Sequence, residues 1–169
     1  IRHYARQGMA LLPPVEGMTA LDVCTGTGII AETLWKHGAQ VTAIDFSEPM
    51  LNQASKKLST KNIALYLMDA RKLTFPDKSF DLVTISMALH EIKPAYRDSV
   101  LSEIQRVSRK YVLIIEHYGV PANPIWRAAL SLIEQIEGSN YKCFIMKDLE
   151  TLLQRAGLKI IKLDVDRNI

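Results

Sequence analysis

The stretch that decides the fold is residues 21–30, LDVCTGTGII, where a short apolar run meets a loop of small residues. Asp22 lies inside the apolar run, and Gly26 and Gly28 stand two apart in the loop. Such a run is typical of a buried strand, and glycines let the backbone turn sharply or approach a ligand closely. A phosphate, a nucleoside or only a tight turn could explain this corner.

Strand-like and helix-like hydrophobic patterns alternate along the rest of the chain. Strands are predicted at residues 20–24, 41–44, 63–68, 80–87, 111–116 and 158–165, and helices at 28–37, 50–58, 96–107, 124–137 and 147–156. This alternation predicts an α/β fold, a doubly wound, Rossmann-like and mostly parallel sheet with helices on both faces. At 169 residues the chain suits a single domain, 1–169, in which residues 1–18 form a helical segment that acts as a lid.

Composition excludes some classes of function. The net charge is +3, and the basic residues are scattered rather than gathered in a stripe, so a nucleic-acid partner is not expected. No apolar run approaches the roughly 20 residues that span a bilayer, and the first residues lack the apolar stretch of a signal peptide. The two cysteines, Cys24 and Cys143, have no metal-type spacing. We expect a cytoplasmic protein without a metal, and a homodimer is compatible with the sequence.

Polar side chains follow four of the predicted strands. Asp22 lies near the end of the first strand, Asp45 ends the second, Asp69 ends the third, and His90 and Glu91 come just after the fourth. In a parallel sheet, ligands bind beyond the carboxyl ends of the strands. These side chains are therefore expected at one edge of the sheet.

Two ligands fit the glycine corner. Residues 26–31 satisfy the dinucleotide pattern G-x-G-x-x-A, and Asp45 follows near the distance expected of a ribose-binding acid. Against a dinucleotide, Asp22 would meet the pyrophosphate with a like charge, and no Arg or Lys lies between Asp22 and Ala31. The same carboxylate suits S-adenosylmethionine, which has a cationic methionine end, a nucleoside and no phosphate. Asp45 could then accept both ribose hydroxyls.

Several motifs occur in the order found in one enzyme family: LDVCTGTG, VTAIDFSEPML, LMDARKLTFPDKSFDLVTISMALHEI and YVLIIE. With them the chain resembles class I S-adenosylmethionine-dependent methyltransferases, and among these the ubiquinone/menaquinone-biosynthesis type and its small-molecule relatives. The resemblance implies a seven-stranded sheet whose last strand is antiparallel, and that seventh strand is not visible in this chain. Cys24 replaces the first glycine of the family's loop, where a positive φ would be unfavourable, and Ser108-Arg109-Lys110 replaces the usual Pro-Gly-Gly turn.

The predicted function is methyl transfer from S-adenosylmethionine to a small, partly hydrophobic acceptor by in-line attack. The alternatives are an NAD-dependent oxidoreductase domain and a non-catalytic cofactor-binding or scaffold protein of the same fold. His90 is the candidate for removing a proton from the acceptor, since its ordinary pKa lies near neutrality. The residues predicted to bind the cofactor are Asp22, Cys24, Thr25, Gly26, Gly28, Asp45, Phe46, Met50, Met68, Asp69, Ala70 and Ser86. Those predicted to bind the acceptor are Tyr4, Glu91, His117 and Tyr118.

Overall fold

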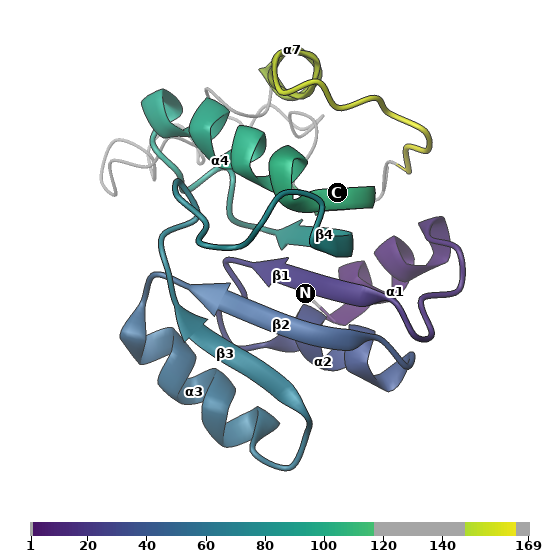
Figure 1. The fold of residues 1–169 in the computed structure, drawn as a ribbon, viewed down its shortest axis with the longest axis vertical. Coiled ribbons are helices and arrows are strands. Elements are labelled where there is room, and N and C mark those ends of the chain that lie inside the picture. The colour runs from purple at the N-terminus through teal and green to yellow at the C-terminus, as the bar shows by residue number, and fades with distance from the viewer. Residues whose placement is uncertain (1, 117–147, 165–169) are drawn as a thin grey trace, which may run out of the picture.

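The computed structural model describes residues 2–116 and 148–164 of the chain, and these form a five-stranded sheet flanked by helices (Figure 1). The sheet order is β3-β2-β1-β4-β5, and every neighbouring pair runs parallel. The strands are β1 (Thr19–Val23), β2 (Gln40–Asp45), β3 (Ile63–Leu67), β4 (Phe80–Ser86) and β5 (Ser108–Ile115). The helices are α1 (Arg2–Leu11), α2 (Ile29–Lys36), α3 (Glu48–Leu58), α4 (Pro94–Val107) and α7 (Asp148–Arg155). The predicted Rossmann-like α/β fold is confirmed.

The chain reverses its direction across the sheet beside β1. From β1 it moves outward through β2 to β3, then returns to place β4 on the other side of β1. Asp22 consequently lies between Ala43 of β2 and Thr84 of β4. This is the topological switch point, where the loops after β1 and β4 diverge and leave room for a ligand.

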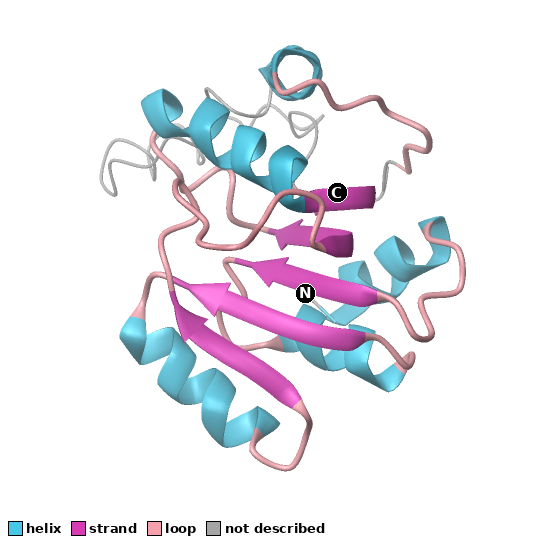
Figure 2. Cartoon of the chain, viewed as in Figure 1, coloured by secondary structure: helices cyan, strands magenta, loops and turns pink. Residues whose placement is uncertain are grey.

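Helices cover both faces of the sheet, as Figure 2 shows, and each face has its own apolar cluster. Ile30 and Leu34 of α2 pack on one face together with side chains of α1 and α3. Val100 and Leu101 of α4 pack on the other face together with α7. Full burial of one such aliphatic side chain stabilises the fold by roughly 1.5–3 kcal/mol. The two clusters thus fix β1 and β4 from both sides and position the loops that follow them.

The N-terminal helix α1 lies within the segment 1–18 that the sequence assigns to a helical lid. Ala5 is buried, and Tyr4, Met9 and Leu12 pack against the same cluster as α2. The helix is therefore part of the packed domain. Its action as a lid stays a prediction. Within residues 2–116 and 148–164, no helix combines the length and apolar character needed to cross a bilayer.

Strand β5 begins three residues earlier than predicted, at Ser108. Val107 ends α4 and Ser108 starts the strand directly, with the extended dihedrals φ −78° and ψ 130°. The segment Ser108-Arg109-Lys110, which replaces the family's usual Pro-Gly-Gly turn, is thus part of the strand. Because no loop separates the two elements, the position of β5 follows directly from that of α4.

The predicted strand at residues 158–165 is wrong for the part that the structure describes, residues 158–164. These residues form no strand, and Ile161 and Leu163 are exposed. A cavity of about 700 Å³ lies between this segment and β5, so their backbones do not pair along the strand. Apolar alternation predicts a strand only where a partner edge is within hydrogen-bond reach. The predicted helix at residues 124–137 lies outside the described residues.

Candidate active site

The switch point gathers the loops that follow β1, β2 and β4. Thr25 is the second residue of the first loop, and its backbone N–H donates to the carbonyl of Ile44 at 2.9 Å. Met87 follows β4, and its N–H donates to the carbonyl of Ile115 at 2.7 Å. The loops are therefore tied to neighbouring strands as they leave the sheet, which gives this edge a fixed backbone frame.

Asp22 is buried in this frame and acts as a cap for helix α2. Its Oδ2 accepts hydrogen bonds from the Thr25 hydroxyl at 2.6 Å and from the Ala31 N–H at 3.1 Å, and its Oδ1 accepts from the Thr84 hydroxyl at 2.7 Å. The N-cap residue, Gly28, has no side chain to supply this acceptor. The carboxylate of Asp22 therefore satisfies a free N–H group of the helix from a neighbouring strand.

Burial changes the acidity of Asp22. Desolvation raises its pKa from 3.8 to about 6, while the hydrogen bonds from Thr25, Thr84 and Ala31 act in the opposite direction. The negative charge of Asp22 already lies at the N-terminus of α2, where a phosphate would otherwise bind. Binding of Asp22 to the cofactor stays a prediction, and the bonds within the protein give it a structural role as well.

Asp45, at the end of β2, holds the glycine loop. Its Oδ2 accepts a hydrogen bond from the Gly26 N–H at 2.7 Å, and its Oδ1 accepts from the Ser47 N–H at 2.8 Å. Each carboxylate oxygen has a further lone pair. The loop itself needs left-handed backbone, with φ +53° at Gly26 and +73° at Gly28. A Cβ on Gly28 would also lie 2.7 Å from a methyl carbon of Leu58, so both the dihedral angle and the space require glycine there.

Cys24 occupies the position where the related family has glycine, and its φ is +55°. This is the left-handed conformation that the sequence analysis named as unfavourable for a side chain. Its thiol is free, and burial, with a smaller contribution from Asp45, raises its pKa to about 12. A thiol with so high a pKa is not a nucleophile near neutral pH.

Exposed apolar side chains lie at the carboxyl ends of β2 and β3. Phe46 is 78% exposed and Met50 is 41% exposed, both on the segment that joins β2 to α3. Unpaired aromatic surface of this kind is suited to contact with a planar base. Met68 and Ala70 lie on the neighbouring loop, where Ala70 is buried.

Asp69 is engaged by Arg71. Its carboxylate accepts a hydrogen bond from the Arg71 N–H at 2.8 Å and forms an ion pair with the Arg71 guanidinium, which lowers the pKa of Asp69. The guanidinium lies 4.5 Å from the ring centre of Tyr96. An adenine amino group that binds Asp69, as predicted, would therefore have to share this carboxylate with Arg71.

Ser86 ends β4 with a buried hydroxyl that has no hydrogen-bond partner among the described residues. A buried polar atom without a partner costs about 1–3 kcal/mol, so such atoms point to a missing ligand or water. The next residue, Met87, has φ +52°, a second strained non-glycine residue at this edge.

His90 is paired with a residue that the sequence analysis missed. The His90 Nδ1 lies 2.8 Å from Oε2 of Glu116, and the Leu89 N–H donates to Oε1 of the same carboxylate at 3.2 Å. Glu116 comes directly after β5, and its side chain is only 2% exposed. The available signal was the motif YVLIIE, in which a charge ends a strand that is otherwise apolar.

The predicted acceptor-binding residues are not brought together by the described part of the chain. Glu91 is 78% exposed, and its Oε1 lies 3.8 Å from Nε2 of His90. Tyr4 lies on α1, in contact with the cluster that includes α2. His117 and Tyr118 lie outside the described residues. No group of three or more His, Cys, Asp or Glu side chains in residues 2–116 and 148–164 could hold a metal ion.

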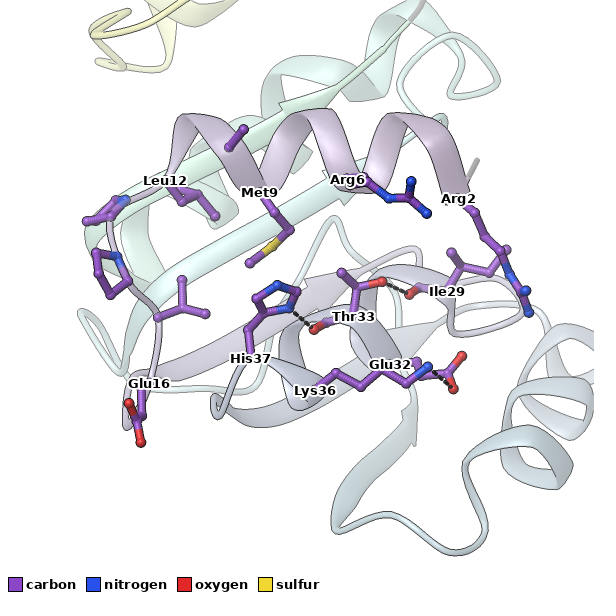
Figure 3. A pocket seen from close by; sticks show the side chains of 14 residues that line it. Arg2, Arg6, Met9, Leu12, Glu16, Ile29, Glu32, Thr33, Lys36 and His37 are labelled. Atoms are coloured by element: carbon purple, nitrogen blue, oxygen red, sulfur yellow. Dashed lines mark hydrogen bonds and ion pairs between the residues drawn. The ribbon is translucent and has the colours of Figure 1, made fainter.

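A cavity of about 740 Å³ lies between α1 and α2 rather than at the switch point (Figure 3). Arg6 and Met9 of α1 line one side, and Lys36 and His37 at the end of α2 line the other. None of the residues predicted to bind the cofactor lines this cavity. The candidate site is instead the open edge of the sheet beyond β1, β2 and β4.

An α/β sheet with a capped glycine loop at its switch point and an acidic residue at the end of β2 is the architecture of the Rossmann-like class. Residues 20–111 match the model of the methyltransferase domain family. Since this match covers more than half of the chain, the protein belongs to the class I S-adenosylmethionine-dependent methyltransferase family. The predicted resemblance is confirmed.

Individual relatives agree with this membership. The chain is 32% identical over 131 residues to a demethylmenaquinone methyltransferase of Thermobifida fusca, covering 75% of this chain and 55% of the relative. It is 38% identical over 115 residues to a phosphatidylethanolamine N-methyltransferase of Cereibacter sphaeroides, covering 64% and 55%. The chain thus spans about half the length of these relatives.

A solved structure agrees on the fold. The S-adenosylmethionine-dependent methyltransferase of Aquifex aeolicus superposes with a TM-score of 0.71 at 24% identity, covering 94% of this chain and 81% of that one.

Proposed function

We propose that the protein transfers a methyl group from S-adenosylmethionine to a small, partly hydrophobic acceptor. The observation that carries the proposal is the pair of hydrogen bonds that Asp45 accepts from Gly26 and Ser47. They fix the carboxylate at the end of β2, with lone pairs left to accept the ribose hydroxyls. A nucleoside that lies along the glycine loop would then place its base against Phe46 and Met50.

The residues present fit this cofactor in a second respect. The buried Ser86 hydroxyl needs a partner, and a polar group of a bound ligand at the switch point would supply one. Asp22, whose charge lies close by, favours the cationic methionine end, directly or through water. When bound, the cofactor supplies a methyl group on a positively charged sulfur, and the chain's own residues bind, orient and exclude water.

A dinucleotide is the less favoured ligand, because Asp22 caps α2 from within the fold. Its Oδ2 accepts from the Ala31 N–H at 3.1 Å, in the first turn of the helix. A pyrophosphate would compete with that carboxylate and be repelled by it. The NAD-dependent alternative is therefore disfavoured.

Two acceptor classes are suggested by the relatives, a quinol and an amine headgroup. The relatives are named a demethylmenaquinone methyltransferase and a phosphatidylethanolamine N-methyltransferase. Both acceptors join an apolar portion to an attacking atom, which agrees with the predicted partly hydrophobic acceptor. We propose His90 as the residue that accepts a proton from the acceptor, with Glu91, Tyr4, His117 and Tyr118 as further candidates for acceptor contact.

The cofactor is tested by thermal unfolding with S-adenosylmethionine, S-adenosylhomocysteine and NAD in parallel. A ligand at 100 times its dissociation constant stabilises by about 2.7 kcal/mol. For a chain of this length we expect a rise in Tm of about 5–11 °C with the two adenosyl ligands and none with NAD. A shift with NAD alone would overturn the proposal. Binding without methyl transfer to a panel of quinols and amines would favour the non-catalytic alternative.

Gly26→Ala should weaken cofactor binding beyond its effect on stability, and Gly17→Ala is its matched control. Both glycines have positive φ, +53° and +74°, and a Cβ on either meets no protein atom within 4 Å. Each variant should therefore lose about 1–2 kcal/mol of stability from backbone strain. Only at Gly26 would the new methyl group meet the cofactor, and we expect a loss of about tenfold or more in affinity for S-adenosylhomocysteine by calorimetry. Equal affinities of the two variants would contradict the proposed ligand position.

The proposal extends to the compartment and the partners. We propose a cytoplasmic enzyme that acts on small molecules and not on nucleic acid. The exclusion of nucleic acid is supported by the pairing of basic side chains with acids: Arg71 with Asp69, Arg106 with Glu103, and Arg109 with Asp81. A homodimer stays a prediction, to be tested by light scattering on the purified protein.

A further inference from the structure

The ring of His90 and the carboxylate of Glu116 form a buried pair at the carboxyl edge of the sheet. The two side chains come from loops after β4 and β5, and their exposed fractions are 15% and 2%. The Glu116 carboxylate contacts two groups, one with each oxygen. Its Oε2 lies 2.8 Å from Nδ1 of His90, and its Oε1 accepts a hydrogen bond from the Leu89 N–H at 3.2 Å. The carboxylate therefore fixes both the backbone before the histidine and the ring itself.

This contact determines which ring nitrogen carries the proton. An ionised carboxylate can only accept hydrogen bonds, so Nδ1 of His90 must be the donor. In the neutral ring the other nitrogen, Nε2, is then an acceptor. A histidine in this form is able to take a proton from a bound molecule.

The backbone of the loop is held independently. Arg97, on α4, is 1% exposed. Its Nε donates to the carbonyls of Leu89 and Ile92 at 2.9 Å, and one of its terminal nitrogens lies 3.3 Å from the carbonyl of His90. The main chain around His90 is thus fixed from α4, while the ring is fixed from β5. Removing the Glu116 carboxylate would alter the ring's protonation without removing these backbone contacts.

We propose that Glu116 is a positioning residue, which holds His90 as the Nδ1–H form so that Nε2 accepts a proton from the methyl acceptor. This inference rests on the proposed methyl transfer. The acceptor's attacking atom gives its electron pair to the methyl carbon, and its proton goes to Nε2. The electron pair of the broken C–S bond stays on sulfur. The site therefore selects acceptors that lose a proton, a hydroxyl, a quinol or an amine, over a thioether, which has no proton to lose.

Charged groups around His90 agree with this role. The hydrogen bond to Glu116 raises the pKa of His90 above its ordinary value of 6.5, burial lowers it, and Glu91 and Arg97 act in opposite directions. The neutral, proton-accepting ring thus dominates only above this raised pKa. Turnover should rise with pH through that value, and in Glu116→Gln the rise should move to lower pH.

The test is nitrogen-15 NMR of the His90 ring in the full chain with S-adenosylhomocysteine bound. In the wild type we expect the neutral ring to be protonated at Nδ1. Glu116→Gln keeps the volume of the side chain, but its amide cannot accept from both Leu89 and Nδ1. If its oxygen faces the Leu89 N–H, its NH₂ group faces Nδ1 and the proton moves to Nε2. We expect this change of tautomer and a lowered pKa of His90.

Two further variants separate positioning from mere charge. Glu91→Gln removes a carboxylate 3.8 Å from Nε2 and should leave the tautomer unchanged. Glu116→Asp keeps the charge and should retain the Nδ1–H form, which keeps the test decisive if Glu116→Gln fails to fold. An Nε2–H ring in the wild type, or an unchanged ring in Glu116→Gln, would overturn the inference. Failure of the wild type to bind S-adenosylhomocysteine would instead count against the proposed function.

The acceptor class is tested with 1,4-naphthoquinol, ethanolamine and dimethyl sulfide as methyl acceptors. Turnover of the quinol or the amine, reduced about 100-fold or more in Glu116→Gln, is the expected result. Methylation of dimethyl sulfide alone would overturn the inference about the acceptor, because that atom has no proton for His90 to take. No turnover with any of the three would count against the proposed acceptor classes and leave the ring measurement to decide on Glu116.

Discussion

Replacing Asp45 with alanine should weaken binding of S-adenosylhomocysteine by about 100-fold or more. The substitution removes the acceptor of the Gly26 and Ser47 N–H groups, 2.7 and 2.8 Å away, and the proposed acceptor of the ribose hydroxyls. Each hydrogen bond to a charged group contributes roughly 1.5–3 kcal/mol, and about 2.8 kcal/mol corresponds to 100-fold in affinity.

Isothermal calorimetry measures this effect directly. Glu150→Ala is a suitable control, since Glu150 is an exposed acid on α7 and is not among the residues proposed to bind the cofactor. It should bind S-adenosylhomocysteine as the wild type does. An Asp45→Ala variant that keeps wild-type affinity would show that the cofactor does not lie along the loop between β1 and α2.

The second large effect is expected on stability, from Asp22→Ala. This change leaves the Ala31 N–H without a hydrogen-bond acceptor. It also removes the acceptor of the Thr25 hydroxyl and that of the Thr84 hydroxyl. Each buried donor left unsatisfied costs about 1–3 kcal/mol, although a hydroxyl can rotate toward another acceptor. We expect a total loss of about 3 kcal/mol and a fall in Tm of roughly 6–12 °C by differential scanning calorimetry.

Asp22→Asn separates the charge of this residue from its hydrogen bonds. The amide oxygen can still accept from the Ala31 N–H, and its NH₂ group can donate to a threonine hydroxyl oxygen. A nearly wild-type Tm together with weaker binding of S-adenosylmethionine would show that the charge of Asp22 contributes to cofactor binding rather than to stability. A fall in Tm as large as that of Asp22→Ala would contradict this division.

The pH dependence of Asp22 has a definite sign. Its pKa is about 6 in the folded protein and 3.8 in the reference state. The folded chain therefore binds the proton first as the pH falls, and protonation of Asp22 favours folding between pH 6 and pH 4. Relative to Asp22→Asn, the wild type should gain stability on going from pH 7 to pH 4, as measured by urea unfolding.

Local patterns were sufficient to predict the elements that build the site. The apolar run before Cys24, the glycines at 26 and 28 and the acid at 45 depend on neighbours close in sequence, and the structure places them as expected. Glu116 was missed because its partner His90 is 26 residues away. A pairing of that kind depends on β4 and β5 being adjacent and in register, which no local pattern reports.

The edge of the sheet and the buried charge of Arg97 were less predictable from the sequence for the same reason. The apolar alternation at residues 158–164 predicted a strand, but strand formation needs an edge within reach, and a cavity separates that segment from β5. Likewise, nothing in its local sequence distinguishes Arg97 from a solvated arginine on α4. Its burial follows from the loop carbonyls of Leu89 and Ile92 that it satisfies.

The left-handed backbone at Cys24 has a consequence for how this sequence can change. At φ +55°, a residue with a Cβ costs about 1–2 kcal/mol that glycine would not. Cysteine and glycine codons differ by a single nucleotide, so a more relaxed loop is one mutation away. The chain thus has within easy genetic reach a gain in stability that could offset a destabilising substitution elsewhere, which would make Cys24 a natural starting point for directed evolution of this protein.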